Sequence, residues 1–283
     1  MSALIYSNVY VSLCAASLVW ATRAQLGAEI GWVDPMVGLV FFATLLVYNL
    51  DRILPASAED RAGPASARHG FIQARKNLLA ALAIVGAVGA LVCGVMLPFG
   101  VFVALVPLGV VAIGYSIPWI PTRQGWRRLK DIPGLKIFLI ALVWAVVTVT
   151  LPAWLVGVEP WSASASWAML ERAAFIFAIT LPFDIRDLAR DRAASIQTIP
   201  VLLGARATKA IALVVLGALA VSAVSRWGMG AGAGALAPIA AYATTAALVA
   251  AVDEERGEMF YAFAIEGTML LLSVSALAGG SLA

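Results

Sequence analysis

The sequence predicts an all-α, polytopic membrane protein, because of its composition, the lengths of its apolar segments and the placement of its basic residues. Of the 283 residues, 62% are hydrophobic and only 12% are charged, whereas soluble domains carry about 25% charged residues. The mean hydropathy is +0.94. We therefore expect lipid rather than water to surround most of the chain.

Nine apolar segments have about the 20 residues that a helix needs to cross a bilayer. In chain order they are Leu4–Thr22, Pro35–Leu54, Leu78–Leu97, Phe99–Pro118, Gly134–Gly157, Trp167–Ile185, Ala207–Ser225, Ala231–Val252 and Met259–Gly280. The longest polar segments between them, Pro55–Asn77 and Trp119–Lys136, are too short to enclose a core of their own. We therefore expect residues 1–283 to form one transmembrane domain of nine helices.

Individual residues refine these segments in chain order. Cys14 in the first segment and Cys93 in the third are expected to be small buried hydrophobes, not a disulfide or metal ligands. Pro55 should end the second helix near Leu54. The third and eighth segments are rich in Gly and Ala, which favours close helix packing. The ninth segment contains Glu266, an acidic residue at membrane depth.

The basic residues predict the orientation of the chain. If the N-terminus is cytoplasmic, only Arg23, Arg172 and Arg226 of the 19 Lys and Arg residues fall on the outer side. The cytoplasmic ones are Arg52, Arg61, Arg68, Arg75, Lys76, Arg123, Arg127, Arg128, Lys130, Lys136, Arg186, Arg190, Arg192, Arg206, Lys209 and Arg256. Because Lys and Arg accumulate in cytoplasmic loops, we expect the N-terminus inside and the C-terminus outside, in a bacterial cytoplasmic membrane.

Three aspartates follow the sixth apolar segment, in the stretch LPFDIRDLARDRAASIQTIPVLLG. At about 100° per residue, Asp184, Asp187 and Asp191 share one face of a helix. Carboxylates crowded on one face repel each other unless a cation lies between them, and Mg²⁺ favours carboxylate and phosphate oxygens. The spacing favours a metal site; the alternative is a solvated helix end with Asp–Arg pairs.

This stretch resembles the second aspartate-rich motif of the UbiA-type intramembrane prenyltransferases, D-x-x-D-x-x-x-D followed by a basic stretch and T-[IL]-P-x-x-[LF]-G. The nine segments, the polar loop after the second segment, and the sequence YSIPWIPTRQGWRRLKDIPGLK also match. The resemblance implies a helical bundle around a lipid-open central cavity with a cytoplasmic polar cap. It also implies an isoprenyl diphosphate donor held through Mg²⁺, a lipophilic acceptor, surrounding membrane lipids and no nucleic acid.

By this resemblance, Asp184, Asp187 and Asp191 are expected to ligate Mg²⁺, and Tyr115 is expected to line the cavity. The resemblance also implies that Lys130 and Arg127 contact the diphosphate. Independently of it, Arg52, Arg61, Arg68 and Arg128 are expected on the same side as the aspartates and are further candidate contacts, because a departing diphosphate needs positive donors. Glu266 could act as a general base or as the partner of a buried arginine, or it could form a structural ion pair or hydrogen bond.

The first aspartate-rich motif of the family, N-x-x-x-D-x-x-x-D, is altered in this sequence. The matching stretch is VYNLDRILPASAED. Counting from Asn49 places Ile53 and Ser57 at the aspartate positions, so Asn49 and Asp51 are the remaining candidate ligands. Asn49 and Asp51 lie two residues apart, about 200° around a helix, and cannot easily share one ion.

Three function classes follow from these observations. The first is a Mg²⁺-dependent enzyme that transfers a prenyl group from its diphosphate to a lipophilic acceptor. The second is an enzyme on the same scaffold that cyclises or hydrolyses the donor, as the altered first motif allows. The third is a non-catalytic relative or a transporter that binds anionic lipids. We favour the first, because all three aspartates of the second motif are present and no clear internal repeat points to a transporter.

Overall fold

The computed structural model describes residues 2–28, 34–54, 67–122, 125–129, 132, 134–193, 196–227 and 236–279 of the chain. Its helices confirm the all-α prediction. They are α1 Ser2–Tyr6, α2 Val9–Gln25, α3 Pro35–Ile53, α5 Ala67–Ala74, α6 Lys76–Val95, α7 Phe99–Ser116, α8 Leu135–Ala145, α9 Leu151–Leu155, α10 Ala163–Arg186, α11 Leu188–Ala193, α12 Ile199–Leu203, α13 Ala205–Trp227, α14 Leu236–Ala250 and α15 Glu266–Gly279. Two π-helical turns, η2 Val146–Thr150 and η4 Phe260–Ile265, continue α8 and precede α15.

A short antiparallel hairpin interrupts the loop that follows α7. Its strands are β1 Ile120–Thr122 and β2 Gly125–Arg127, with Pro121 opposite Trp126. The sequence predicts a polar loop between Trp119 and Lys136 and gives no sign of a hairpin there. Strands this short lack the hydrophobic periodicity that would predict them.

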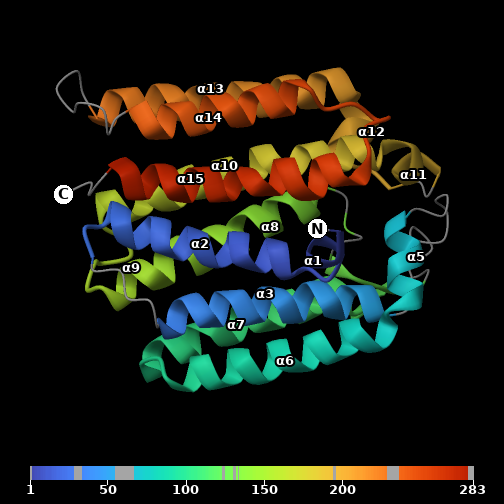
Figure 1. The fold of residues 1–283 in the computed structure, drawn as a ribbon, viewed down its shortest axis with the longest axis horizontal. Coiled ribbons are helices and arrows are strands. Elements are labelled where there is room, and N and C mark those ends of the chain that lie inside the picture. Colours follow the sequence, from blue (N-terminus) through green and yellow to red (C-terminus); the bar gives the residue numbers. More distant parts are fainter. Residues whose placement is uncertain are drawn as a thin grey trace.

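The long helices lie side by side along one direction of the molecule (Figure 1). Helix α3 packs against α6 and α2, and α2 packs against α15; on the other side α10 packs against α8 and α13, and α13 against α14. The short helices α5, α11 and α12 gather at one end of the bundle (Figure 1). The bundle therefore has a long apolar body and one end built from short helices and loops.

Local interactions fix where α3 begins and ends. The Asp34 side chain accepts a hydrogen bond from the Met36 backbone at 2.8 Å, and Pro35 occupies the first turn, where its missing N–H costs nothing. Asp34 also forms an ion pair with Arg23 at 2.9 Å. The helix ends at Ile53, close to the end that Pro55 predicted. Its last turn carries Asp51 and Arg52 toward the end with the short helices.

The third apolar segment packs closely, as its small residues predicted. A Cβ atom at Gly86 of α6 would lie 2.7 Å from the backbone nitrogen of Leu46 and 2.8 Å from the carbonyl oxygen of Phe42 on α3. Since real Cβ atoms do not approach backbone so closely, glycine is needed for α3 and α6 to come together.

Five helices are long and apolar enough to cross a membrane by length and composition: Pro35–Ile53, Lys76–Val95, Leu135–Leu155, Ala205–Ser225 and Phe260–Ala278. The helices Phe99–Tyr115 and Leu236–Ala250 are apolar but shorter. The chain is therefore an integral membrane protein, and the count of nine crossings stays a prediction.

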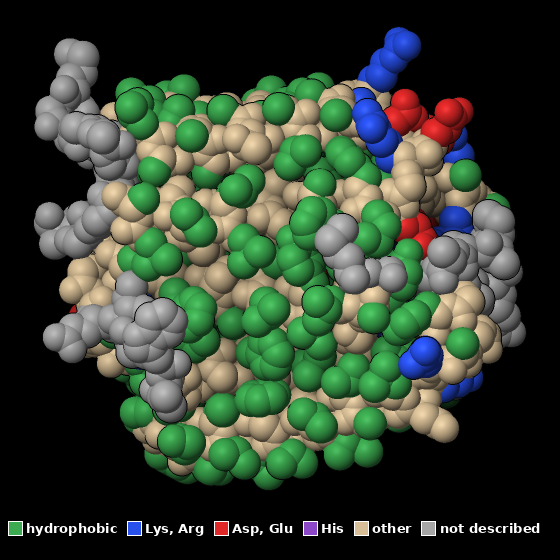
Figure 2. Space-filling model, viewed as in Figure 1, with side chains coloured by type: hydrophobic (Ala, Val, Ile, Leu, Met, Phe, Trp, Pro, Cys, Tyr) green, Lys and Arg blue, Asp and Glu red, His purple; other side chains and the backbone are tan. Residues whose placement is uncertain are grey.

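The surface separates into an apolar body and one charged end. On the face that Figure 2 shows, hydrophobic side chains cover the body, whereas Lys, Arg, Asp and Glu side chains gather near α11, α12 and α5. Such a separation is expected for a protein whose body contacts lipid and whose charged end contacts water.

Candidate functional site

A cavity of about 490 Å³ opens at the charged end. Helices α1, α2, α3, α7, α8, α10 and α15, with η4, form its walls, and α5, α6, α11 and α12 contribute residues to its lining. Its lining includes Arg52 in the last turn of α3, Lys136 in the first turn of α8, and Arg186 at the end of α10. The charged residues in its wall are Asp51, Arg52, Lys76, Lys136, Asp184, Arg186, Asp187, Arg190, Glu258 and Glu266. The apolar residues farthest from this end are Val11, Val47, Val111, Trp144, Ile176 and Met269.

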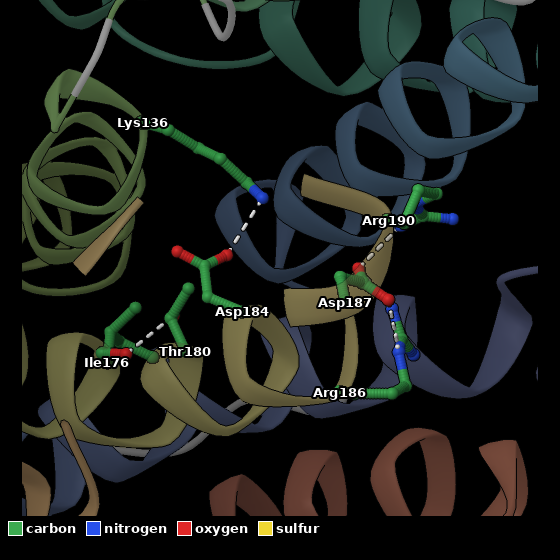
Figure 3. A network of polar contacts seen from close by, with 7 residues as sticks. All are labelled: Lys136, Ile176, Thr180, Asp184, Arg186, Asp187 and Arg190. Carbon is green, nitrogen blue, oxygen red and sulfur yellow. Dashed lines mark hydrogen bonds and ion pairs between the residues drawn. The ribbon is translucent and has the colours of Figure 1, made fainter. Parts of the chain in front are cut away.

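Asp184 forms an ion pair across the cavity wall with Lys136. The Lys136 Nζ atom donates to Oδ1 of Asp184 at 2.9 Å (Figure 3). The Asp184 side chain is 1% exposed, whereas the Lys136 side chain is 25% exposed. Removing one partner of such a buried pair would leave an uncompensated charge, which is strongly destabilising. The pair therefore joins α8 to α10 at the level where the cavity becomes apolar.

Asp187 is held by two arginines of its own segment. Arg186 donates from Nε to Oδ1 at 2.8 Å and from Nη2 to Oδ2 at 2.9 Å, and Arg190 Nη2 lies 2.7 Å from Oδ2 (Figure 3). Burial by itself would raise the pKa of Asp187, but the Arg186 hydrogen bond and the two positive charges outweigh burial and lower it. Asp187 therefore stays ionised at neutral pH.

The guanidinium group of Arg186 is fixed by aromatic rings as well as by Asp187. Its Cζ atom lies 5.3 Å from the ring centroid of Phe183 and 5.5 Å from that of Tyr261. Contacts of a cation with ring faces at such distances are attractive. Arg186 is thus positioned by two helices at the entrance of the cavity.

The three aspartates do not share one continuous helix. Helix α10 ends at Arg186, Asp187 is its C-cap, and α11 begins at Leu188. Asp184 and Asp187 line the cavity, whereas Asp191 in α11 is buried and is not part of its lining. Asp184 and Asp187 therefore both face the cavity, whereas a metal site shared with Asp191 stays a prediction.

The two remaining candidates of the altered first motif take different positions. Asp51 lines the cavity beside Arg52. Asn49 is fully buried outside the lining, where it accepts a hydrogen bond from Asn8 Nδ2 at 3.1 Å and donates to the Ser7 carbonyl oxygen at 3.1 Å. Asn49 thereby fixes the junction between α1 and α2, at which Asn8 has a φ of 64°.

The other predicted contacts differ in whether they line the cavity. Tyr115 and Arg52 line the cavity, and Arg128 is buried outside its lining. Arg61 and Lys130 lie outside the described residues, as do the side chains of Arg68 and Arg127. The part of the site contributed by the two polar loops therefore stays a prediction.

Glu266 lines the cavity more deeply than the aspartates. Glu258, Ala262 and Glu266 face the cavity at a spacing of four residues, which runs from the charged end inward along η4. Within the described part of the chain, no hydrogen bond or ion pair engages the Glu266 carboxylate. It begins α15 directly after a π-helical turn, a feature that often accompanies functional sites.

The sequence does not identify Lys136 as the partner of Asp184, although Lys136 lies inside the predicted segment Gly134–Gly157, where a basic residue is costly. The pairs of Asp187 with Arg186 and Arg190 agree with the Asp–Arg pairs that the sequence offers as the alternative to a metal site. The position of Lys136 at the start of an apolar helix could have marked it as a site residue. Nothing in the sequence indicates that its partner is Asp184, which lies 48 residues away.

The donor atoms at this site fit Mg²⁺ as part of a metal–phosphate complex. Among the described residues, no three His, Cys, Asp or Glu side chains are grouped closely enough to enclose a metal ion. Mg²⁺ does not need such an enclosure, because it is usually held by one or two carboxylates together with phosphate oxygens and water. The cavity wall contains the carboxylates of Asp184 and Asp187 and the cationic groups of Lys136, Arg186 and Arg190, the kinds of group that such a complex would need.

Comparisons with known proteins agree with this architecture. A sequence model described as the UbiA prenyltransferase family matches residues 68–273. No curated protein matches the sequence. The apo structure of a UbiA homologue from Aeropyrum pernix K1 has a TM-score of 0.63 and 17% identity, over 96% of each chain. A UbiA homologue from Archaeoglobus fulgidus, bound to GPP and Mg²⁺, has a TM-score of 0.60 and 13% identity, over 97% of this chain and 99% of that one.

Proposed function

Because the chain belongs to the UbiA prenyltransferase family, we propose that it is an intramembrane, Mg²⁺-dependent enzyme that moves an isoprenyl group from its diphosphate to a lipophilic acceptor. One observation carries the proposal: Asp184, Asp187 and their cationic partners lie at the entrance of a cavity whose far wall is apolar. An isoprenyl diphosphate has the same division, with a charged head and an apolar tail. The homologue bound to GPP and Mg²⁺ supports this assignment.

The charged entrance suits the binding of a diphosphate. We assign Asp184 and Asp187 as the residues that hold Mg²⁺, with Asp191 and Asp51 as further candidate ligands. Mg²⁺, when bound, neutralises the charge that develops on the departing diphosphate. Lys136 and Arg186 then donate hydrogen bonds to phosphate oxygens, and such charge-assisted bonds strengthen as the negative charge develops. Asn49 acts indirectly, by fixing the helix junction behind Asp51.

The inner cavity suits the isoprenyl chain. Its apolar wall excludes water, which would otherwise capture the allylic cation left after ionisation. Glu266 is the acidic group within this part of the cavity, and we assign it to the acceptor side, where a carboxylate can take the proton that the attacking group loses. Tyr115, in the last turn of α7, lines the cavity nearer its charged end. Arg61, Arg68, Arg127, Arg128 and Lys130 stay predicted contacts of the diphosphate.

A second function is favoured by the altered first motif. Asn49 is used in helix packing, and among the described residues of that stretch, which end at Leu54, Asp51 is the acidic residue that lines the cavity. A site with fewer carboxylates could process the donor without transfer, by hydrolysis or cyclisation. The two functions differ in product: transfer yields a prenylated acceptor, whereas the alternatives yield a free or cyclised isoprenoid. A non-catalytic lipid-binding relative would yield none of these.

The proposed function is tested by measuring Mg²⁺-dependent binding of geranyl diphosphate to the protein in nanodiscs. The variants are Asp184→Asn, Asp187→Asn and Asp191→Asn, each checked for folding by thermal unfolding, with Asp51→Asn and Asn49→Ala as comparisons. Losing a carboxylate that holds the metal should weaken binding at least tenfold at Asp184 and Asp187, and more than at Asp51 or Asn49. Wild-type affinity in all three second-motif variants would overturn the proposal. Lipid products from membranes, identified by mass spectrometry, distinguish transfer from hydrolysis and cyclisation.

A further inference from the structure

The apolar part of the cavity has a depth that two helices define independently. The ion pair between Lys136 and Asp184 marks the charged level. The deepest lining residues on the same helices are Trp144 of α8 and Ile176 of α10, and each lies eight residues from the ion-paired residue of its helix. At a rise of 1.5 Å per residue, both helices place the bottom of the cavity about 12 Å from the ion pair.

Below this level the bundle is closed on the sides of α2, α10 and α15. Cys14 and Phe175 are fully buried, Leu272 is almost so, and all three belong to the main hydrophobic core instead of the cavity lining. Trp144 has the largest side chain at the bottom of the cavity. It packs against this core and against the second hydrophobic cluster, which α2, α3, α7 and α9 form.

A second apolar space, of about 500 Å³, follows the same helices beyond Trp144. Its wall includes Leu108, one turn along α7 from the cavity residue Val111, and Val146, two residues after Trp144. Trp144 lines the first space and not the second. Trp144, Leu108 and Val146 all pack against the second hydrophobic cluster, so a smaller side chain at position 144 would extend the first space in their direction.

The depth can be compared with the length of an isoprenyl chain. Each unit adds four main-chain carbons, so carbon–carbon bonds of about 1.5 Å give an extended length of about 5 Å per unit. On this measure a ten-carbon chain is about 10 Å long and fits between the ion pair and Trp144 when extended. A fifteen-carbon chain is about 3 Å longer than the depth and fits only with a bend, whereas a twenty-carbon chain is about 8 Å too long.

We propose that the donor carries an isoprenyl chain of ten to fifteen carbons and that Trp144 sets this limit. The inference rests on the proposed function, because it takes the diphosphate to lie beside Asp184. Trp144 is a specificity-determining residue: it touches the end of the chain and takes no part in ionisation. In its absence the chain continues into the space beside Leu108 and Val146.

The test measures binding of thiolodiphosphate analogues, which resist ionisation, to the protein in nanodiscs with Mg²⁺. The geranyl, farnesyl and geranylgeranyl analogues have ten, fifteen and twenty carbons. In the wild type, the twenty-carbon analogue should bind at least tenfold more weakly than the better of the shorter two. In Trp144→Ala, this ratio should fall at least tenfold, because the longer chain gains a place to lie. Trp144→Leu, which retains a large apolar group, should give an intermediate ratio.

The matched control is Trp167→Ala, which removes an indole from α10 outside both spaces and should leave the ratio unchanged. Equal affinity of the wild type for all three analogues would overturn the chain-length limit while leaving the proposed function intact. The wild-type series alone tests the limit, even if Trp144→Ala does not fold. A wild-type preference that survives in Trp144→Leu and Trp144→Ala would exclude Trp144 as its cause. If no analogue of any length binds, the proposed function itself fails.

Discussion

Replacing Lys136 by Met should affect Mg²⁺ and diphosphate in opposite directions. In the wild type, Lys136 Nζ is 2.9 Å from Asp184 Oδ1, so the lysine competes with a metal ion for that carboxylate. Lys136→Met keeps an unbranched apolar side chain of nearly the same length and removes the charge. The freed carboxylate should bind Mg²⁺ more tightly when Mg²⁺ is offered alone. Diphosphate should bind more weakly, because it loses a cationic donor.

The expected change in diphosphate affinity follows from the strength of hydrogen bonds between charged groups. Such bonds contribute about 1.5–3 kcal/mol, and each 1.4 kcal/mol changes a dissociation constant about tenfold. Loss of Lys136 should therefore weaken diphosphate binding by about ten- to hundredfold. The variant also leaves Asp184 buried without its cation, which should lower the thermal unfolding midpoint in the absence of metal. Added Mg²⁺ should raise that midpoint more in Lys136→Met than in the wild type.

Isothermal titration calorimetry in nanodiscs can measure the two ligands separately, with MgCl₂ alone, sodium diphosphate alone, and diphosphate in the presence of Mg²⁺. The reciprocal variant, Asp184→Asn, should bind diphosphate alone at least as well as the wild type, because Lys136 is released, and should lose the enhancement by Mg²⁺. Lys209→Met is the matched control, since Lys209 contacts backbone carbonyls of Ala250 and Val252 outside the cavity. A Lys136→Met variant that binds both Mg²⁺ and diphosphate more weakly would refute the idea that Lys136 and Mg²⁺ compete for the Asp184 carboxylate.

Three further predictions concern the acceptor side, the packing and the orientation. Glu266→Gln should leave Mg²⁺-dependent geranyl diphosphate binding unchanged and reduce transfer at least a hundredfold; product formation at the wild-type rate would remove Glu266 from the reaction. Gly86→Ala should lower the thermal unfolding midpoint, because its Cβ atom would lie 2.7 Å from the backbone nitrogen of Leu46. The control Gly217→Ala has open space around its Cβ atom and should be neutral or stabilising. Equal effects of the two substitutions would show that α3 and α6 are not so close. The cysteine introduced by Glu254→Cys should react with an impermeant maleimide only from the cytoplasmic side. The cysteine introduced by Ser164→Cys should react only from the outside. The opposite pattern would reverse the predicted topology.

Properties that depend on neighbouring residues were accessible from the sequence. The apolar segments are helical because a chain in lipid must satisfy its backbone hydrogen bonds within each segment. Pro55 predicted the end of α3 to within a residue or two, and Gly-rich composition predicted the close approach at Gly86. The spacing of Asp184 and Asp187 after an apolar run predicted acidic residues at one end of the bundle, and both line the cavity.

What the tertiary structure decided is which distant side chains meet. Lys136 reaches Asp184 across 48 residues of sequence, and Asn49 is drawn to Asn8 instead of the cavity. Asp191 is buried and does not line the cavity, unlike Asp184 and Asp187. The depth of the cavity likewise depends on where Trp144 and Ile176 come to lie on adjacent helices. Helical periodicity fixes the direction of a side chain only relative to its own helix; the rotation and axial position of each helix against its neighbours are set by packing along the whole interface.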